Sequence, residues 1–178
     1  MKKIISLFQR NYESDRLVRD ELVPGAEWVS KGEGVATRKY DGTCCLVKEG
    51  KLYKRYELKA GRIAPPNFEI LGTDEITGKS VGWVPVTDNP ENKWHNEPPI
   101  PMKDGTYELI GPKIQGNPEH YPHHVFIEHD SAERLLDAPR TFTELREYLM
   151  RKDIEGIVWH HPDGRMVKIK KKDFGLKR

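Results

Sequence analysis

The chain has 178 residues, 36% of them hydrophobic and 33% charged, which predicts a single domain with a buried core over residues 1–178. Its 30 lysines and arginines nearly balance 28 aspartates and glutamates, so the net charge of +2 does not by itself indicate a nucleic-acid partner. No apolar run approaches the roughly 20 residues that a membrane-spanning helix needs, so we expect no membrane partner.

Cys44 and Cys45 are the only cysteines in the chain. Neighbouring cysteines rarely pair with each other, so the sequence predicts no disulfide framework and a reducing, cytoplasmic location. Several histidines invite a metal site, but their spacing matches no zinc-binding pattern, and we expect no structural zinc. These are His120, His123, His124, His129, His160 and His161.

The N-terminal part of the chain predicts short strands. Residues 1–20 mix apolar and charged residues without a clean period, and their apolar stretch is too short for a signal peptide. Residues 27–29 and 34–38 are expected to form short strands. The second strand leads into the segment Lys39-Tyr40-Asp41-Gly42-Thr43.

A β-hairpin is predicted immediately after this segment. Residues 44–48 are followed by a Glu49-Gly50 turn and a second strand at 51–57. Because a hairpin reverses the chain, Arg55 is expected to return toward the end that carries Lys39. Two cations could then face one anion.

Residues 62–104 form a segment rich in proline and glycine, and proline removes backbone hydrogen-bond donors. We therefore expect an insertion without continuous secondary structure. Trp83 and Trp94 favour an ordered segment packed on the body of the domain over a free linker. Such a segment is also a natural place for a substrate-binding surface.

Two strands and a helix are predicted in the C-terminal half. The strands are expected at 107–110 and 124–128. Thr141-Phe142-Thr143-Glu144 resembles a capping box, and the helical spacing of the apolar residues after it predicts a helix that ends near Arg151.

A second hairpin is predicted from residues 155–160 and 165–170, joined by Pro162-Asp163-Gly164. Side chains alternate along a strand, so Lys168 and Lys170 should share one face, and Val167 and Ile169 should share the other. The last few residues are expected to form a solvated basic tail.

Lys39 is the candidate nucleophile of the chain. Taken alone, a lysine followed two residues later by Asp41-Gly42 is equally typical of a turn with a surface lysine, so the interpretation depends on the residues around it. A lysine attacks only when it is neutral, and its unperturbed pKa is about 10.4. Neighbouring cations and burial lower a lysine pKa. Arg55, Lys168 and Lys170 could supply that positive field, and the same charges could hold phosphate groups.

Two carboxylates are expected near the ends of strands, where side chains could converge on a cleft. They are Glu108, before Gly111, and Glu155, before Gly156. Carboxylate oxygens are ligands for a hard divalent cation. A single strand glutamate usually faces solvent, so the interpretation depends on the occurrence of both residues together with Lys39.

Five segments, in this order, resemble the motifs of covalent nucleotidyltransferases, the superfamily of ATP-dependent DNA ligases, RNA ligases and mRNA capping enzymes. They are Lys39-Tyr40-Asp41-Gly42-Thr43, Arg55, Tyr107-Glu108-Leu109-Ile110-Gly111, Glu155-Gly156-Ile157-Val158 and Lys168-Ile169-Lys170. With Cys44-Cys45 and the downstream Gly82-Trp83-Val84-Pro85-Val86, the chain resembles more specifically the small ATP-dependent 5′-to-3′ RNA ligases of animals, bacteria and viruses. The resemblance runs from about Trp28 to Phe174.

The resemblance implies an α+β nucleotidyltransferase (ATP-grasp-like) fold, with two antiparallel sheets flanked by helices around a nucleotide cleft. It implies that Lys39 attacks the α-phosphate of ATP, forms a phosphoramidate with AMP and releases pyrophosphate. The AMP would then pass to an RNA 5′-phosphate, and a 3′-hydroxyl would displace it to form a phosphodiester. The implied partner is RNA with these two ends, and we expect a monomer.

The resemblance also implies roles for individual side chains. Arg55 would contact ribose or phosphate, and Glu108 would bind the ribose hydroxyls. Lys168 and Lys170 would hold the α-phosphate. A ring between His123 and Phe126 would stack on adenine, although Phe126 could equally belong to the core. The nucleotide-binding set is Lys39, Asp41, Gly42, Arg55, Glu108, Phe126, Lys168 and Lys170, and the ligands of Mg²⁺ or Mn²⁺ are Glu155, Glu108 and Asp41.

One feature departs from the larger members of the superfamily. Many ligases and capping enzymes carry a C-terminal OB-fold domain, and the sequence leaves no room for one after Lys170. We therefore interpret the chain as a minimal RNA ligase. The alternatives are a guanylyltransferase or DNA ligase of the same superfamily, or a nucleic-acid-binding module without activity.

Overall fold

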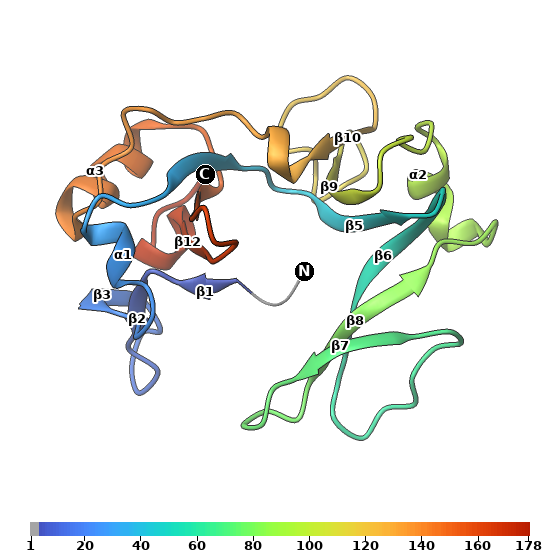
Figure 1. Cartoon of the computed structure of the whole chain (residues 1–178), viewed down its shortest axis with the longest axis horizontal. Coiled ribbons are helices and arrows are strands. Elements are labelled where there is room, and N and C mark those ends of the chain that lie inside the picture. The colour runs from blue at the N-terminus through green and yellow to red at the C-terminus, as the bar shows by residue number, and fades with distance from the viewer. Residues whose placement is uncertain (1–3) are drawn as a thin grey trace. The chain divides into compact units, whose positions relative to one another are not determined.

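The computed structural model describes residues 4–178 and divides them into two compact units (Figure 1). Unit 1 is Asp41–Ser131, and unit 2 combines Ile4–Tyr40 with Ala132–Arg178. Unit 1 is thus an insertion in the sequence of unit 2. The single domain predicted over residues 1–178 stays a prediction, and its first three residues lie outside the described part.

Unit 2 is built on a four-stranded sheet in the order β1–β12–β11–β4. Strand β11 pairs antiparallel with both β12 and β4, whereas β1 runs parallel to β12. The strands are β1 (Ile5–Ser6), β4 (Val35–Lys39), β11 (Gly156–His160) and β12 (Met166–Lys170). Beside this sheet stand the antiparallel pair β2 (Phe8–Arg10) and β3 (Val18–Leu22), and the helices α1 (Glu27–Ser30), α3 (Phe142–Arg151) and η3 (Lys171–Phe174).

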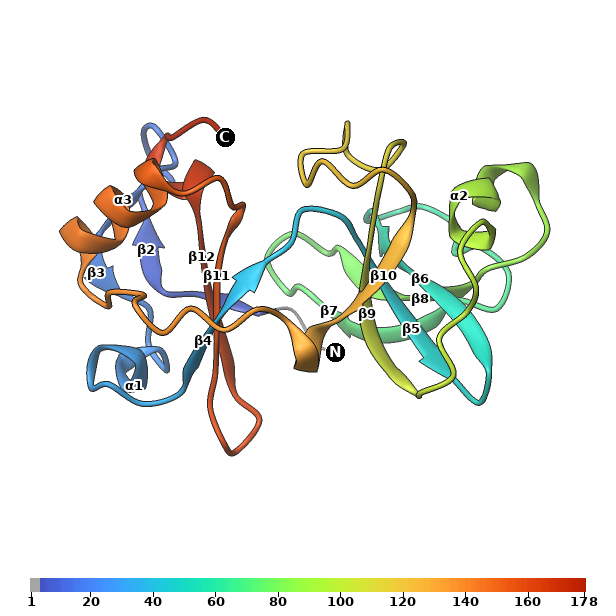
Figure 2. The same ribbon diagram turned by 90° about the horizontal axis from the view of Figure 1, so that it is seen from above.

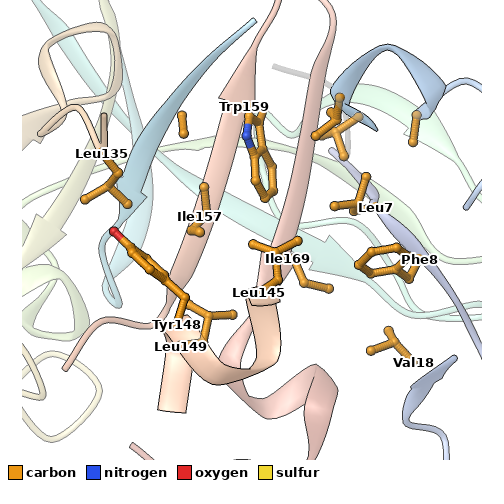
Figure 3. Close-up of a cluster of buried hydrophobic side chains, with 14 of the residues drawn as sticks. Leu7, Phe8, Val18, Leu135, Leu145, Tyr148, Leu149, Ile157, Trp159 and Ile169 are labelled. Carbon is orange, nitrogen blue, oxygen red and sulfur yellow. The ribbon is translucent and has the colours of Figure 1, made fainter. Parts of the chain in front are cut away.

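The core of unit 2 lies between its main sheet and α3, which runs along one side of β11 and β12 (Figure 2). Leu145 and Leu149, four residues apart on the helix, are fully buried. They belong to the same cluster as Ile157, Trp159 and Ile169 of the sheet (Figure 3). This packing fixes the strands whose ends carry the candidate lysines.

Unit 1 is built on a six-stranded antiparallel sheet in the order β10–β9–β5–β6–β8–β7. Its strands are β5 (Thr43–Lys48), β6 (Lys51–Leu58), β7 (Glu69–Thr73), β8 (Ser80–Pro85), β9 (Gly105–Ile110) and β10 (Val125–Glu128). Three short helices complete it: η1 (Pro90–Asn92), α2 (Lys93–Asn96) and η2 (His129–Ser131). A second core cluster covers one face of this sheet; it comprises Cys45, Val47, Leu52, Tyr107, Leu109 and Ile114.

The main elements predicted from the sequence are confirmed. The structure is α+β, with mostly antiparallel sheets and few helices. Both hairpins, the strands β9 and β10, and the helix after Thr141 form as expected. The Thr141 hydroxyl donates to the Glu144 carboxylate at 2.6 Å rather than capping the helix backbone. Among residues 4–178, no helix combines the length and apolar character that crossing a membrane would require.

The strand predicted for residues 27–29 is wrong, because these residues begin helix α1. The Glu27 carboxylate accepts a hydrogen bond from the Gly25 backbone at 2.8 Å, and Lys31 N donates to Glu27 O at 3.2 Å. Trp28 and Val29 are both buried. Two consecutive buried side chains fit a helix that packs on the core better than an alternating strand.

Two other expectations need correction, and one stretch without an assignment from the sequence is now described. Residues 62–104 contain the paired strands β7 and β8, because the prolines of this segment flank the strands or, as Pro85 does, end one. Within residues 1–20, β1 and β2 form and β3 begins, but they are too short to show a period. The parallel pairing of β1 with β12 makes the sheet of unit 2 mixed rather than wholly antiparallel.

Candidate functional site

Lys39 is the last residue of β4, and its ammonium group contacts a carboxylate of unit 2. Lys39 Nζ donates to Glu155 Oε2 at 2.5 Å. The two side chains are only 21% and 15% exposed. The pair is therefore partly shielded from water, which strengthens its electrostatic attraction.

Gly156, next to Glu155, lies between two lysine-bearing strands. It pairs with Lys39 of β4 on one side and with Lys170 of β12 on the other. A Cβ atom at this position would lie 2.2 Å from the Ile169 carbonyl oxygen and 2.8 Å from the Lys170 Cα. The absence of a side chain thus permits the close approach of the strands that end in Lys39 and Lys170.

Lys168 and Lys170 lie on one face of β12 and are partly buried, whereas Val167 and Ile169 are fully buried, as the alternation predicts. Burial, followed by the charges of Lys170 and Lys39, lowers the pKa of Lys168 to about 8. Burial and the nearby Lys172 also lower the pKa of Lys170. The three lysines therefore form a concentrated positive field, which a bound phosphate would relieve.

A network at the end of β12 supports this field. The Lys170 backbone N–H donates to Asp173 Oδ2 at 2.8 Å, and the buried Asp173 carboxylate also pairs with Arg10. Lys170 is thereby fixed through its backbone while its side chain stays on the face of Lys168. Unit 2 thus brings together four of the predicted site residues, Lys39, Glu155, Lys168 and Lys170.

In unit 1, strand register places a row of functional side chains on the face opposite the core. Arg55 pairs with Trp83, Cys44 with Glu108, and Glu108 with Ile127. Arg55 lies on the same face as Cys44, because the adjacent pair in the β6–β5 register, Lys54 with Cys45, lies on the core face. Cross-strand partners share a sheet face, so the row runs across β8, β6, β5, β9 and β10.

Arg55 is held by an aromatic ring and borders a groove. Its guanidinium carbon lies 5.3 Å from the centre of the Trp83 ring, and burial lowers its pKa while Cys44 opposes that effect. A groove of about 440 Å³ runs beside it, with Glu57, Thr73 and Lys79 among its lining residues. The hairpin thus returns Arg55 to the Cys44 end of β5. That Arg55 and Lys39 face one anion stays a prediction.

Asp41 and Gly42 are positioned by backbone contacts within unit 1. The Asp41 backbone N–H donates to the buried Glu119 carboxylate at 2.8 Å. A Cβ on Gly42 would lie 2.2 Å from the Leu109 carbonyl oxygen and 3.0 Å from Glu108 Cγ. Glycine is therefore required here because the backbone passes directly over β9 beside Glu108.

Glu108 is buried and engages a histidine that the sequence reasoning left out of the site. Its Oε2 lies 3.0 Å from His129 Nε2, and His129 Nδ1 lies 2.9 Å from Thr106 Oγ1. His129 follows β10 directly. The pairing of β10 with β9 is the signal that could have found it. Glu128 pairs with Tyr107, so the next residue, His129, comes beside Thr106 and on the face of Glu108.

Phe126 lies on the other face of the sheet from Glu108. It pairs with Leu109, a core residue, and its ring meets that of Tyr107 edge to face with centroids 6.3 Å apart. The structure thus gives this half-buried ring a packing role beside the core of unit 1. Stacking of Phe126 on adenine stays a prediction.

Comparisons with known proteins agree with the resemblance seen in the sequence. A family model described as RNA ligase 1 matches residues 97–178, the part that contains Glu108, Glu155, Lys168 and Lys170. A zebrafish (Danio rerio) protein named RNA ligase 1 is 24% identical over 95% of this chain and 76% of its own length. Proteins of the same name from Rattus norvegicus and Pongo abelii are 26% and 25% identical, each over 80% of this chain and 67% of the relative. The chain is therefore similar to the RNA ligase 1 family model over residues 97–178, and to proteins named RNA ligase 1 over most of its length.

Proposed function

We propose that this chain is an ATP-dependent RNA ligase that works through a covalent lysyl-AMP intermediate on Lys39. The observation that carries the proposal is the arrangement in unit 2, where Lys39 Nζ lies 2.5 Å from Glu155 in the positive field that includes Lys168 and Lys170. The names of the relatives, RNA ligase 1, support the substrate class. The fold implied is that of the nucleotidyltransferases.

In the first step, Lys39 Nζ attacks the α-phosphorus of ATP. A P–N bond forms, the bond from the α-phosphorus to the bridging oxygen breaks, and pyrophosphate leaves. The amine must give up a proton before it attacks. Glu155 is the carboxylate in contact with Lys39, so it serves as the proton acceptor.

Lys168 and Lys170 bind the α-phosphate and stabilise the negative charge on its oxygens during transfer. A cation held in a partly buried place interacts more strongly with such charge than an exposed one does. Both lysines are partly buried, and this loss of hydration lowers the pKa of each. A phosphate group restores the lost interactions.

In the second step, an oxygen of the RNA 5′-phosphate attacks the phosphorus of the lysyl-AMP. The P–N bond breaks, and the nitrogen leaves as the amine of Lys39. In the third step, an RNA 3′-hydroxyl attacks the activated 5′-phosphate, and AMP departs as the phosphodiester forms. Arg55, beside its groove in unit 1, and Glu108 are proposed to contact the nucleotide and the RNA 5′ end.

We propose that the reaction uses a divalent ion, Mg²⁺ or Mn²⁺. Glu155, Glu108 and Asp41 are the residues proposed to hold it, and carboxylates are the ligands that such hard cations prefer. When bound, the ion would neutralise negative charge on the phosphates. We propose that the enzyme acts as a monomer on RNA with 5′-phosphate and 3′-hydroxyl ends.

Incubation with radiolabelled ATP tests the proposal directly. With Mg²⁺ or Mn²⁺, the wild-type chain should form an AMP adduct that survives denaturation, because a P–N bond is covalent. Lys39→Ala should abolish the adduct and leave the fold intact. Lys31→Ala is the matched control, since Lys31 is an exposed lysine of the same unit, and it should label normally.

The same assay separates the alternatives. Labelling by GTP without ATP would indicate a guanylyltransferase, and sealing of nicked DNA in preference to RNA would indicate a DNA ligase. Labelling that persists in Lys39→Ala would identify another nucleophile. If neither nucleotide labels the folded protein at any pH, the chain is a binding module.

A further inference from the structure

Three side chains of unit 1 bring a thiol, a carboxylate and an imidazole to one place. They belong to Cys44, Glu108 and His129, and their ligand atoms all lie within 4.8 Å of one another. Glu108 is buried, and the other two residues are half-buried. The three come from β5, β9 and the start of η2, so no sequence spacing announces them.

Strand pairing fixes this cluster. Cys44 and Glu108 are direct cross-strand partners on β5 and β9, and such partners have Cβ atoms about 5 Å apart. His129 follows the last residue of β10, which pairs with β9. The pairings of β5 with β9 and of β9 with β10 therefore bring the three side chains together, and no loop has to move.

The separations suit a metal ion. With metal–ligand bonds of about 2.0–2.3 Å, tetrahedral ligand atoms stand about 3.3–3.8 Å apart. His129 Nε2 and Glu108 Oε2 are already 3.0 Å apart, and the thiol lies within 4.8 Å of both. A small rotation of the side chains would close the remaining difference.

Thr106 supports the cluster from behind. Its hydroxyl lies 2.9 Å from His129 Nδ1. A hydroxyl can either donate or accept, so it satisfies Nδ1 in both tautomers of the ring. When His129 carries its proton on Nδ1 and donates it to Thr106, Nε2 presents a lone pair toward Glu108 and Cys44. A metal-binding histidine has this arrangement, with its second nitrogen hydrogen-bonded.

We propose that Cys44, Glu108 and His129 bind a thiophilic divalent cation of the Zn²⁺ class and leave a fourth coordination position open. A thiolate and an imidazole favour Zn²⁺ or Co²⁺ over Mg²⁺, which prefers oxygen ligands alone. On binding, a sulfur–metal bond forms and the thiol proton passes to solvent. Three protein ligands with an open position are typical of reactive rather than purely structural zinc sites.

This site is distinct in chemistry from the proposed lysyl-AMP centre, although Glu108 is shared. Lys39 and its partners in unit 2 supply no ligand to it, so the metal site does not depend on adenylyl transfer. A bound Zn²⁺ would instead occupy Glu108, the carboxylate that is proposed above to contact the nucleotide and to hold Mg²⁺ or Mn²⁺. The Lys39→Ala variant therefore separates the two proposals.

Cobalt is the probe, because a Co²⁺–thiolate bond gives a near-ultraviolet charge-transfer band and tetrahedral Co²⁺ absorbs in the visible. The full chain, kept reduced with a phosphine and free of nucleotide, is titrated with Co²⁺ alone. We expect both absorptions to saturate at one equivalent. Zn²⁺ should then displace the cobalt and remove them, and Lys39→Ala should behave as the wild type does.

Adjacent cysteines provide a matched pair of variants. Cys44→Ala should lose the charge-transfer band, whereas Cys45→Ala should keep it, because Cys45 is fully buried on the core face. Thr106→Val should weaken Co²⁺ binding by about tenfold or more, as loss of a hydrogen bond to a metal-binding histidine does elsewhere. Circular dichroism checks the fold of each variant.

Two results would overturn the proposal. One is a folded wild-type chain that shows no thiolate band at any Co²⁺ concentration, in which case His129 and Glu108 form only a hydrogen bond. The other is a band that persists in Cys44→Ala or Cys44→Ser. Failure of ATP to label Lys39 would leave the cobalt result unchanged, so the two proposals fail separately.

Discussion

Lys168 is a lysine whose charged form the fold destabilises. Its amine is partly buried beside Lys170 and Lys39, and its pKa falls to about 8 as a result. At neutral pH the charge survives, so the side chain can still bind phosphate. Under the proposed function, the same residue would set an upper pH limit on nucleotide binding.

We predict that triphosphate affinity falls as the pH rises above about 8. A phosphate binds the charged form of Lys168. Above the pKa of Lys168 in the folded chain, the side chain must take up a proton before the phosphate binds. The triphosphate affinity should then fall by up to about tenfold per pH unit. The measurement is the Kd of wild type for an ATP analogue with a non-cleavable α,β-methylene bridge, between about pH 7 and pH 9.5.

Lys168→Arg is the control for this pH dependence. Arginine keeps its charge over the whole range, so the fall in affinity should shrink. An equal fall in both proteins would assign the effect to another group. Arginine has a different shape, so its absolute affinity is not the criterion.

At the scale of elements, β11 positions two lysines through one glycine. Gly156 pairs with both Lys39 and Lys170, and the space that its missing side chain leaves is filled by backbone of β12. The chemistry of the site thus depends on an inter-strand distance as well as on charge. A substitution that widens this distance and leaves every charge in place should therefore show how far the activity depends on the spacing of the strands.

We predict that Gly156→Ala destabilises the protein by about 1–3 kcal/mol and lowers AMP-adduct formation further than the lost stability explains. The added Cβ would meet the Ile169 carbonyl at 2.2 Å, so β12 must move away and take Lys170 with it. Denaturant unfolding and adduct assays on the folded protein measure the two effects. Gly72→Ala should be nearly neutral in both, because a Cβ at Gly72 meets nothing within 4 Å.

Some of these elements could be predicted from the sequence and others could not. Hairpins and the long helix could be predicted, because turn residues and local periodicity encode them. Helix α1 was missed, since four residues are too few to show a helical period. The strands β7 and β8 were hidden by the prolines that surround them.

For the candidate site, the motif residues of unit 2 could be placed together because they lie at strand ends of one predicted hairpin and its neighbour. The contact of Lys39 with Glu155 follows from the pairing of β4 with β11. By contrast, the cluster of Cys44, Glu108 and His129 depends on the register of three strands. The register between strands that are distant in sequence is a tertiary property, so this cluster could not be predicted from a single sequence.

At the scale of the whole chain, each unit has its own hydrophobic core. The cluster of unit 2 includes Leu149 and the cluster of unit 1 includes Leu109, and both side chains are fully buried. No described residue belongs to both clusters. Each unit can therefore lose stability through its own core.

We predict that Leu149→Ala and Leu109→Ala destabilise different sets of amides. Each removes about 2–5 kcal/mol of core stability. Amide hydrogen exchange should show faster exchange in α3, β11 and β12 for the first variant, and in β5, β9 and β10 for the second. If either variant accelerates exchange equally in both sets, the two units unfold as one cooperative structure.

The way in which the chain enters and leaves unit 1 has a further consequence. Within unit 2, the segments on either side of the insertion run side by side: Arg38 N donates to Glu133 O at 2.8 Å, and Leu135 N donates to Ala36 O at 2.9 Å. A short turn could therefore bridge the two without disturbing β4. The insertion is suited to exchange between homologues, and chimaeras of this kind would reveal which half of a ligase chooses its RNA.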